Sequence, residues 1–354
     1  MKRALILLLL LVVSGAVIYR ILTNNRETVS EVLMASSRGT ALVIPGAAAR
    51  IPQEAALLEQ LHRTGELDSV VFISGVSSGA LNAVMLNAIL SGRYTWEQYR
   101  NLLFGLENQD IFINEGRGLP VSTEPLKKLL TTILHDTLGW YRMGDLPIPT
   151  SLSVVSLSLT SLSKSTFRLS NLKINRESDP ELDLVEVLMA STAFPVAFPP
   201  VTINRVTTLP ESQYIDGGSA VDYIPYRAVL DFETYTGKNV DRLILVCRKP
   251  DTEAGMREEL RELGIDRIDQ AEKFGISLEE LGRISFKNGL LALRREAPIL
   301  ADKTLLYIPE IEKDYPLFDF HSMREQYLAT FEWATRHLPI HFNEIVPTLN
   351  EIDP

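Results

Sequence analysis

This sequence has few cysteines and fewer basic than acidic residues, and each of these features excludes a class of protein. The 354 residues include one cysteine, Cys247, which excludes intramolecular disulfides and metal sites built from cysteine clusters. The formal net charge is -10 at pH 7, whereas nucleic acids and anionic lipid surfaces attract proteins with a basic face. We therefore expect no nucleic-acid partner, and we expect any membrane contact to be apolar.

Metal-binding spacings, internal repeats and low-complexity tracts are also missing from the sequence. No calcium-loop or zinc-site pattern occurs, so we expect neither a metal nor another cofactor. Hydrophobic residues make up 45% of the chain and charged residues 23%, which is enough apolar material for one large core. The composition therefore predicts a single globular domain.

The longest apolar run lies at the amino terminus and is short for a membrane span. It extends from Ala4 to Tyr19, about 16 residues, against the roughly 20 that a spanning helix needs. Two basic residues precede it, and Ser14-Gly15-Ala16 offers a small-residue cleavage site. We predict a signal peptide or membrane anchor over residues 1–22 and a body outside the cytoplasm. The pattern does not decide between cleavage and retention, and the membrane orientation stays open.

The chain after this segment divides at changes in composition. Residues 23–40 are polar and irregular and are interpreted as a tether. We expect the globular domain over residues 41–340 and a C-terminal tail over residues 341–354. Within the domain, residues 253–293 form a charged, helical stretch, which we interpret as packed surface, with a lid or a membrane-facing helix pair as the alternative.

Two strand-loop-helix units follow each other at the start of the globular part. The first has an apolar strand at Ala41–Ile44, a loop of small residues, and a helix from Pro52 to about Arg63. The second runs from the strand Val70–Ile73 through a turn to the apolar helix Ala80–Leu90. Two such units in succession predict parallel strands with crossover helices, and so an α/β fold. Further strands are expected at 151–160, 166–169, 212–215, 243–247 and 304–308, and a helix at 181–190.

The turn of the second unit carries a serine between two glycines, in the order Gly75-Val76-Ser77-Ser78-Gly79. A serine at this spacing, between a strand and a helix, is typical of a nucleophile elbow, in which small glycines let strand and helix pass closely. Ser77 is therefore a candidate nucleophile, and Ser78 is placed to cap the helix. A small-residue turn before a buried helix is the structural alternative.

A serine hydroxyl becomes nucleophilic when a neighbouring base takes its proton, and histidine is the usual base. His62, His135 and His337 lie near expected helix ends, where a cation complements the helix dipole. A Ser-His-Asp triad would then have to use His321 or His341.

The competing base is Asp216, which ends an expected strand and precedes Gly217 and Gly218. The glycines allow the aspartate to approach another loop, and partial burial would make its carboxylate basic enough to accept a proton. Asp-Gly is also a strong hairpin signal, so a simple turn is the alternative.

Three motifs together resemble the patatin-like phospholipases, in both order and spacing. They are the nucleophile turn with the following Ala80-Leu81-Asn82-Ala83, residues 190–200 with their Phe-Pro pairs, and Asp216-Gly217-Gly218. The similarity covers residues 41 to about 338. It implies a patatin-like three-layer α/β/α fold with a mainly parallel central sheet. It also implies hydrolysis of lipid esters, of phospholipids or lysophospholipids, through an acyl-enzyme and a Ser-Asp dyad, with Ser77 as nucleophile and Asp216 as base.

The sequence departs from the family in the loop after the first strand. The family has a glycine-rich stretch with an arginine there, and its backbone amides stabilise the oxyanion. Here Gly46, Ala47, Ala48 and Arg50 take these positions, so the resemblance places the oxyanion hole among them. A positive φ at either alanine would cost on the order of 1 kcal/mol. Arg50 is alternatively a surface residue at a helix start. The family's asparagines after the acid motif are replaced by residues 222–225.

Two other functions therefore remain open beside the Ser-Asp hydrolase. One is a lipid-binding protein on the same fold with weak or no turnover, because of the altered loop. The other is a Ser-His-Asp esterase.

Overall fold

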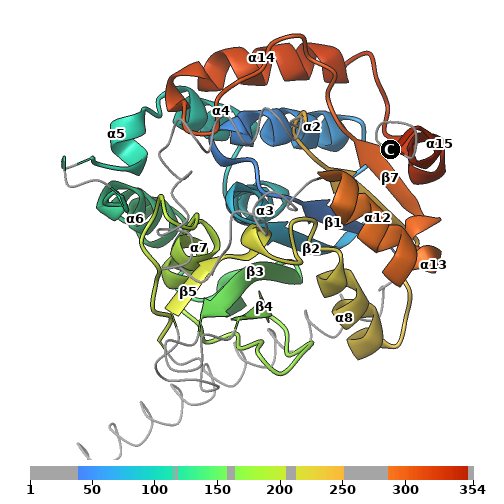
Figure 1. Ribbon diagram of the computed structural model, residues 1–354, viewed down its shortest axis with the longest axis horizontal. Helices are drawn as coiled ribbons and strands as arrows, with labels where there is room; N and C mark the ends of the chain where they lie inside the picture. The colour runs from blue at the N-terminus through green and yellow to red at the C-terminus, as the bar shows by residue number, and fades with distance from the viewer. Residues whose placement is uncertain are drawn as a thin grey trace, which may run out of the picture.

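The computed structural model describes residues 39–114, 116, 119–157, 164–204, 213–250 and 286–349 (Figure 1). The predicted amino-terminal segment, most of the tether and most of the charged stretch 253–293 lie outside the described residues. Among the residues that are described, no helix has the length and apolar character needed to cross a membrane.

A mixed sheet with parallel central strands forms the middle of the molecule. Its order is β4-β3-β2-β1-β6-β7-β8, and β5 pairs with β3. The neighbours β1–β2, β1–β6, β2–β3 and β6–β7 are parallel, whereas β4 and β5 are antiparallel to β3 and β8 is antiparallel to β7. The strands are β1 (Thr40–Ile44), β2 (Val70–Val76), β3 (Thr150–Leu157), β4 (Lys164–Ser170), β5 (Gln213–Asp216), β6 (Arg242–Val246), β7 (Thr304–Tyr307) and β8 (Ile340–His341).

Helices cover both faces of this sheet, because alternate side chains of a strand point to opposite sides. Leu42 and Ile44 of β1 belong to one buried core, and Ala41 and Val43 belong to a second. The first core lies under α2 (Ile51–Arg63), α3 (Ser78–Leu90), α4 (Trp96–Phe104), α5 (Asn108–Ile111), α6 (Glu124–Thr131), the π-helix η2 (Thr132–Leu138), α7 (Leu184–Ser191) and α14 (Met323–Ala334). The second lies under α8 (Arg227–Thr236), α12 (Phe286–Glu296), α13 (Pro298–Ala301) and α15 (Phe342–Leu349). The predicted three-layer α/β/α fold with a mainly parallel sheet is confirmed.

Short 3-10 helices complete the connections. They are η1 (Ala48–Arg50), η3 (Met143–Asp145), η4 (Gly217–Ser219) and η5 (Phe320–Ser322). Because η4 follows β5 directly, Asp216-Gly217 does not turn a hairpin, and that alternative is wrong.

The turn between β2 and α3 is tighter than the sequence suggested. The strand continues to Val76 and the helix begins at Ser78, so Ser77 alone makes the turn. Ser78 is therefore not the helix cap; its hydroxyl accepts a hydrogen bond from the amide of Ala47 at 2.7 Å. The predicted reason for the two glycines is confirmed. A Cβ on Gly75 would lie 2.5 Å from the Gly79 carbonyl oxygen, and one on Gly79 would lie 2.1 Å from the Pro45 carbonyl oxygen.

The carboxyl-terminal part of the chain is more ordered than the predicted tail. Ile340 and His341 form β8, and α15 follows at once. Phe342 is fully buried in the second core. The folded part of the chain therefore extends past residue 340, as far as Leu349. Cys247 is buried directly after β6, as its place in an apolar run predicted.

Candidate active site

One edge of β3 brings the two candidate catalytic residues together. Along this edge β2 pairs with the first half of the strand and β5 with the second. Val76, which precedes Ser77, is the partner of Ser153, and Asp216 is the partner of Val154. Because β2 is parallel and β5 antiparallel to β3, their carboxyl ends meet head to head at consecutive positions, about 3.3 Å apart along a strand.

Ser77 occupies a strained backbone conformation at this junction. Its φ is 57° and its ψ is -133°, a region that costs a non-glycine residue roughly 1–3 kcal/mol. A hydrogen bond from its amide to the Ser191 hydroxyl, at 3.0 Å, helps to hold this conformation. The Ser191 hydroxyl in turn donates to the carbonyl oxygen of Ser153 at 2.8 Å. Ser191 thus ties the turn to both α7 and β3, a role that its place in the 190–200 motif did not reveal.

Asp216 presents a buried carboxyl group at the same junction. The residue is 3% exposed, and burial raises the pKa of its carboxyl group to about 7. A hydrogen bond with the Ser77 side chain and a 2.7 Å hydrogen bond from the Gly218 amide oppose part of this rise in pKa. A carboxylate with a pKa near neutrality, in contact with a serine hydroxyl, is suited to take a proton from it at physiological pH.

The loop after β1 passes directly over Ser77. A Cβ on Gly46 would lie 2.9 Å from the Ser77 Cβ and 3.4 Å from its Oγ, so only glycine fits here. Ala48 has a positive φ of 48°. This conformation is costly for alanine, whereas the glycine of the family pattern would adopt it freely. The Ala47 amide donates to Ser78 and is therefore not free to bind an oxyanion in this conformation. Within the described ranges, the amides of Gly46 and Ala48 donate to no protein acceptor.

Arg50 is buried rather than exposed, so the surface alternative is wrong. The residue is 3% exposed, and its Nε donates to the carbonyl oxygen of Tyr315 at 2.5 Å. The guanidinium group therefore links the loop after β1 to the carboxyl-terminal part of the chain.

The histidines have other contacts. His62 accepts a hydrogen bond from the indole of Trp96 at 2.7 Å, and His337 stacks on Trp333 with ring centroids 4.3 Å apart. His135 stacks on Tyr141, whereas His321 and His341 are exposed. Across the described part of the chain, no histidine is hydrogen-bonded to Ser77 or Asp216, so nothing in this geometry favours the triad. The described residues also hold no cluster of three or more His, Cys, Asp or Glu side chains that could bind a metal ion.

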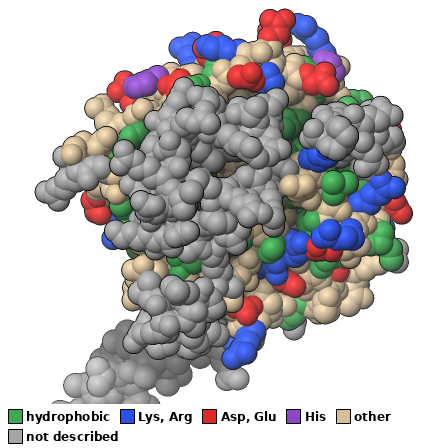
Figure 2. All heavy atoms as spheres, viewed as in Figure 1, with side chains coloured by type: hydrophobic (Ala, Val, Ile, Leu, Met, Phe, Trp, Pro, Cys, Tyr) green, Lys and Arg blue, Asp and Glu red, His purple; other side chains and the backbone are tan. Residues whose placement is uncertain are grey.

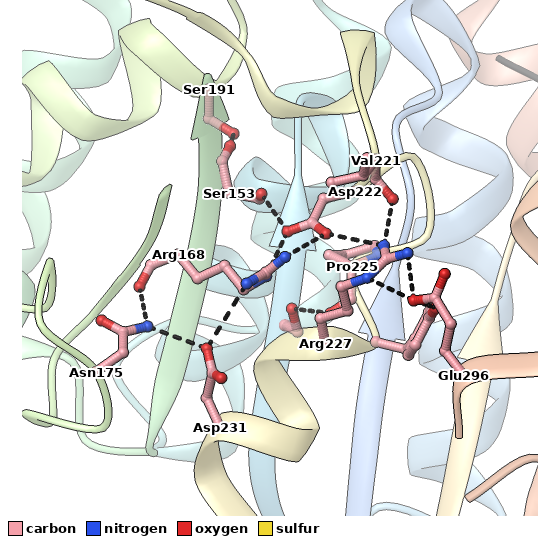
Figure 3. A network of polar contacts seen from close by, with 12 residues as sticks. Ser153, Arg168, Asn175, Ser191, Val221, Asp222, Pro225, Arg227, Asp231 and Glu296 are labelled. Atoms are coloured by element: carbon pink, nitrogen blue, oxygen red, sulfur yellow. Dashed lines mark hydrogen bonds and ion pairs between the residues drawn. The ribbon is translucent and has the colours of Figure 1, made fainter. Parts of the chain in front are cut away.

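Asp222 anchors the loop that carries Asp216 (Figure 3). It is fully buried and accepts hydrogen bonds from Ser153 Oγ at 2.8 Å and from Arg168 Nε at 2.7 Å. Arg227 Nη1 lies 3.4 Å from its other oxygen. Two arginines compensate the buried charge, and removal of one partner from such a pair typically costs 3–5 kcal/mol.

This anchor also connects the loops of both candidate catalytic residues. The hydroxyl of Ser153 donates to Asp222, while its carbonyl oxygen accepts from Ser191, which holds Ser77. In the sequence, residue 222 was notable only as a departure from the family pattern. Its anchoring role could not be predicted, because its partner Arg168 lies 54 positions away in the chain.

Comparison with known proteins agrees with this fold. Residues 42–230, more than half of the chain, match the patatin-like phospholipase family. The chain belongs to that family, which confirms the resemblance seen in the motifs. Family membership supports hydrolysis of lipid esters as the general activity.

Several solved structures are similar to the chain at low identity. VipD from Legionella pneumophila is 14% identical, with a TM-score of 0.42 over 85% of this chain and 67% of that chain. Human GIVD cytosolic phospholipase A2 is 10% identical, with a TM-score of 0.46 over 94% of this chain and 64% of that chain. The type III effector protein ExoU is 11% identical, with a TM-score of 0.33 over 85% and 53%. The matched part is thus between half and two thirds of each of these proteins. No curated protein matches the sequence.

The raised pKa of Asp216 gives the site a defined pH dependence. The carboxylate accepts a proton and the carboxylic acid does not, so kcat/KM for an ester should rise as pH increases through about 7 and level off above it. Initial rates on a soluble ester between pH 5 and 9 measure this profile. A rate that is constant from pH 5 to 8 would show that no group with this pKa limits the reaction.

Proposed function

We propose that the chain is a serine acyl hydrolase that cleaves ester bonds of phospholipids or lysophospholipids through a Ser77–Asp216 dyad. One observation carries the proposal. The strained serine turn and a buried carboxyl group with a pKa of about 7 meet on one edge of β3, in a chain of the patatin-like phospholipase family.

The geometry supports a two-step reaction. Asp216 takes the proton of Ser77 Oγ as this oxygen attacks the acyl carbonyl carbon, and the carbonyl electron pair moves onto the oxygen. The amides of Gly46 and Ala48, which donate to no acceptor within the described residues, are the candidate donors to that oxyanion. When the intermediate collapses, Asp216 returns its proton to the departing alcohol and an acyl-enzyme remains. Water, deprotonated by Asp216, then attacks the acyl-enzyme. As this second intermediate collapses, Asp216 returns the proton to Ser77 Oγ, and the fatty acid is released.

An apolar cavity beside the nucleophile helix is a candidate site for a short part of an acyl chain. Its volume is about 60 Å³, and its walls come from α2, α3, α4, α5, α6, η2 and α7. Leu81, Val84 and Met85 line it from one face of α3, four, seven and eight positions after Ser77. At 1.5 Å per residue, this places them about 6 to 12 Å from Ser77 along the helix axis. Ile51, the first residue after the η1 loop, also lines the cavity. The apolar walls favour a hydrocarbon chain over a polar ligand.

The altered loop keeps one alternative open, a lipid-binding protein without turnover. The Ala47 amide is occupied by Ser78, and Ala48 is strained, so this loop offers fewer unstrained donors than a glycine-rich one. A covalent probe of the nucleophile separates the two functions, because only an activated serine reacts with a fluorophosphonate.

The dyad is tested by single substitutions at its two members. Ser77→Ala and Asp216→Asn should each lower kcat on a lysophospholipid by at least about a thousandfold, because nucleophile and base act as a unit. Ser77→Ala should also abolish fluorophosphonate labelling. Circular dichroism and melting temperature check that both variants are folded.

The matched control for the dyad is the His321→Ala/His341→Ala double variant, which should keep wild-type turnover. Label that persists in Ser77→Ala, or turnover that is lost in the histidine variant, would contradict the dyad. A wild-type chain that takes no label would favour the lipid-binding alternative.

Enlarging a cavity side chain tests the acyl-chain site. Val84→Phe should lower kcat/KM for long-chain esters at least tenfold and leave short-chain esters nearly unchanged, because the larger ring occupies space that only a long chain reaches. Kinetics on a series of ester chain lengths measure the effect. Leu90→Phe, at the end of the same helix and outside the cavity, is the control. An equal fall in kcat/KM for short-chain and long-chain esters would contradict the assignment of this cavity as the acyl-chain site.

We also propose that the body acts outside the cytoplasm, at a membrane surface. The support is the apolar segment within residues 1–22. On the face shown in Figure 2, acidic and basic side chains of the described residues lie among one another. The mass of the mature amino terminus tests the processing: loss of about 16 residues indicates export, and retention indicates an anchor. A full-length chain recovered in the cytosol would contradict both.

A further inference from the structure

The loop over Ser77 is held by a segment that lies outside the residues matched to the family. This segment, residues 315–326, runs into the first turn of α14, and α14 lies along α2 at the top of Figure 1. The family match ends at residue 230. The contacts between this segment and the loop are therefore additional to the family motifs.

Main-chain and side-chain hydrogen bonds join the two. The Ala49 amide donates to the Leu317 carbonyl oxygen at 2.8 Å, and Arg50 Nε donates to the Tyr315 carbonyl oxygen at 2.5 Å. Gln326 Nε2 donates to the Ala49 carbonyl oxygen at 3.0 Å. Ala49 is thus held through both its amide and its carbonyl group, next to the strained Ala48.

Gln326 is the central side chain of this contact. It is fully buried, and its Oε1 accepts a hydrogen bond from Gln53 Nε2 at 3.0 Å. Its second donor hydrogen reaches the Ser322 hydroxyl at 2.9 Å. The side-chain amide of Gln326 therefore connects η1, α2 and η5. Both of its donor hydrogens and its oxygen are hydrogen-bonded, and these bonds fix the positions of the three partners. The next residue, Tyr327, donates its hydroxyl hydrogen to Glu59 of α2, so the helix that carries Gln326 is itself anchored.

Aromatic contacts extend the same segment to the loop after α7. Phe318 meets Phe194 and Phe198 edge to face, with ring centroids 5.7 Å apart in each pair. Val196, between the two, is the third non-glycine residue with a positive φ, at 70°. Two of the strained turns of the site, at Ala48 and in this loop, are thus braced by residues 315–326.

We propose that residues 315–326 act as a clamp on the loop over Ser77, with Gln326 as its positioning residue. The clamp keeps Ala48 at positive φ and so fixes the amides of Gly46 and Ala48 against Ser77, in a loop where alanines replace the family's glycines. This rests on the proposed function. An amide that is held in place before the reaction stabilises the oxyanion without reorganisation, so the clamp acts on the transition state more than on substrate binding.

The test is Gln326→Met, which keeps the length of the side chain and removes its hydrogen bonds. We expect kcat to fall at least tenfold with KM within twofold of wild type, and fluorophosphonate labelling of Ser77 to slow by a similar factor. Adding Ala48→Gly to Gln326→Met should raise kcat at least threefold above that of Gln326→Met alone, because glycine adopts a positive φ without strain. Because the relief of strain also raises global stability, the melting temperature of each variant is measured beside kcat.

Thr330→Val is the matched control. Thr330 lies one turn further along α14, is equally buried, and its hydroxyl has no hydrogen-bond partner within the described residues. This variant should keep wild-type kinetics. Should Gln326→Met fail to fold, Gln326→Leu is the second variant, because it also removes these hydrogen bonds and introduces no buried charge.

Amide hydrogen exchange gives a readout that does not depend on turnover. In Gln326→Met, a peptide spanning residues 45–51 should exchange at least tenfold faster than in wild type, and Thr330→Val should not change it. Unchanged exchange in this peptide, or unchanged kcat in Gln326→Met, overturns the clamp. A wild-type chain without ester turnover instead overturns the proposed function, and the exchange result still decides the clamp.

Discussion

The shared edge of β3 is the constraint on which the rest of this site depends. A strand has two edges, and β4 occupies one of them along most of β3. On the other edge, parallel β2 and antiparallel β5 divide the length between them, so their carboxyl ends face each other at Ser153 and Val154. This register places the serine turn and the aspartate loop side by side although they are far apart in the chain. Helix α3, the loop after β1 and the Asp222 anchor all serve to keep that junction closed.

Two buried aspartates six positions apart have opposite surroundings and therefore different uses. Asp222 is compensated by Arg168 and Arg227, as Figure 3 shows, and anchors its loop. Among the described residues, hydrogen bonds from Ser77 and Gly218 are all that oppose the burial of Asp216, so its pKa rises from 3.8 to about 7. Keeping that group ionised at alkaline pH costs the fold about 4 kcal/mol. Protonated Asp216 stabilises the fold fully below about pH 3.8, and this contribution is lost as pH rises through about 7. The burial that makes the Asp216 carboxylate more basic therefore also lowers the stability of the fold at high pH.

Local signals in the sequence were enough for the α/β fold class and for Ser77 as a candidate nucleophile, whereas Asp216 was separated from a simple turn by the family resemblance. The glycine spacing around Ser77 and the strand end at Asp216 depend on neighbours a few positions away, and the structure brings both to one junction. The partners of Ser78, Asp222 and Gln326 could not be predicted, because each lies in another unit of the chain and is selected by the tertiary fold. The same limit applies to the residues after 340, where Phe342 is buried by elements far from it in sequence. The Ser-Asp assignment itself stays a prediction.

A crystal structure of the fluorophosphonate adduct tests the central claim most directly. We predict that phosphorus is bonded to Ser77 Oγ and that the phosphonyl oxygen lies about 3 Å from the amides of Gly46 and Ala48. The Asp216 carboxyl group should lie within hydrogen-bond distance of the modified serine. An adduct on another residue would contradict it. So would a structure in which Asp216 faces away from Ser77 and an imidazole takes its place.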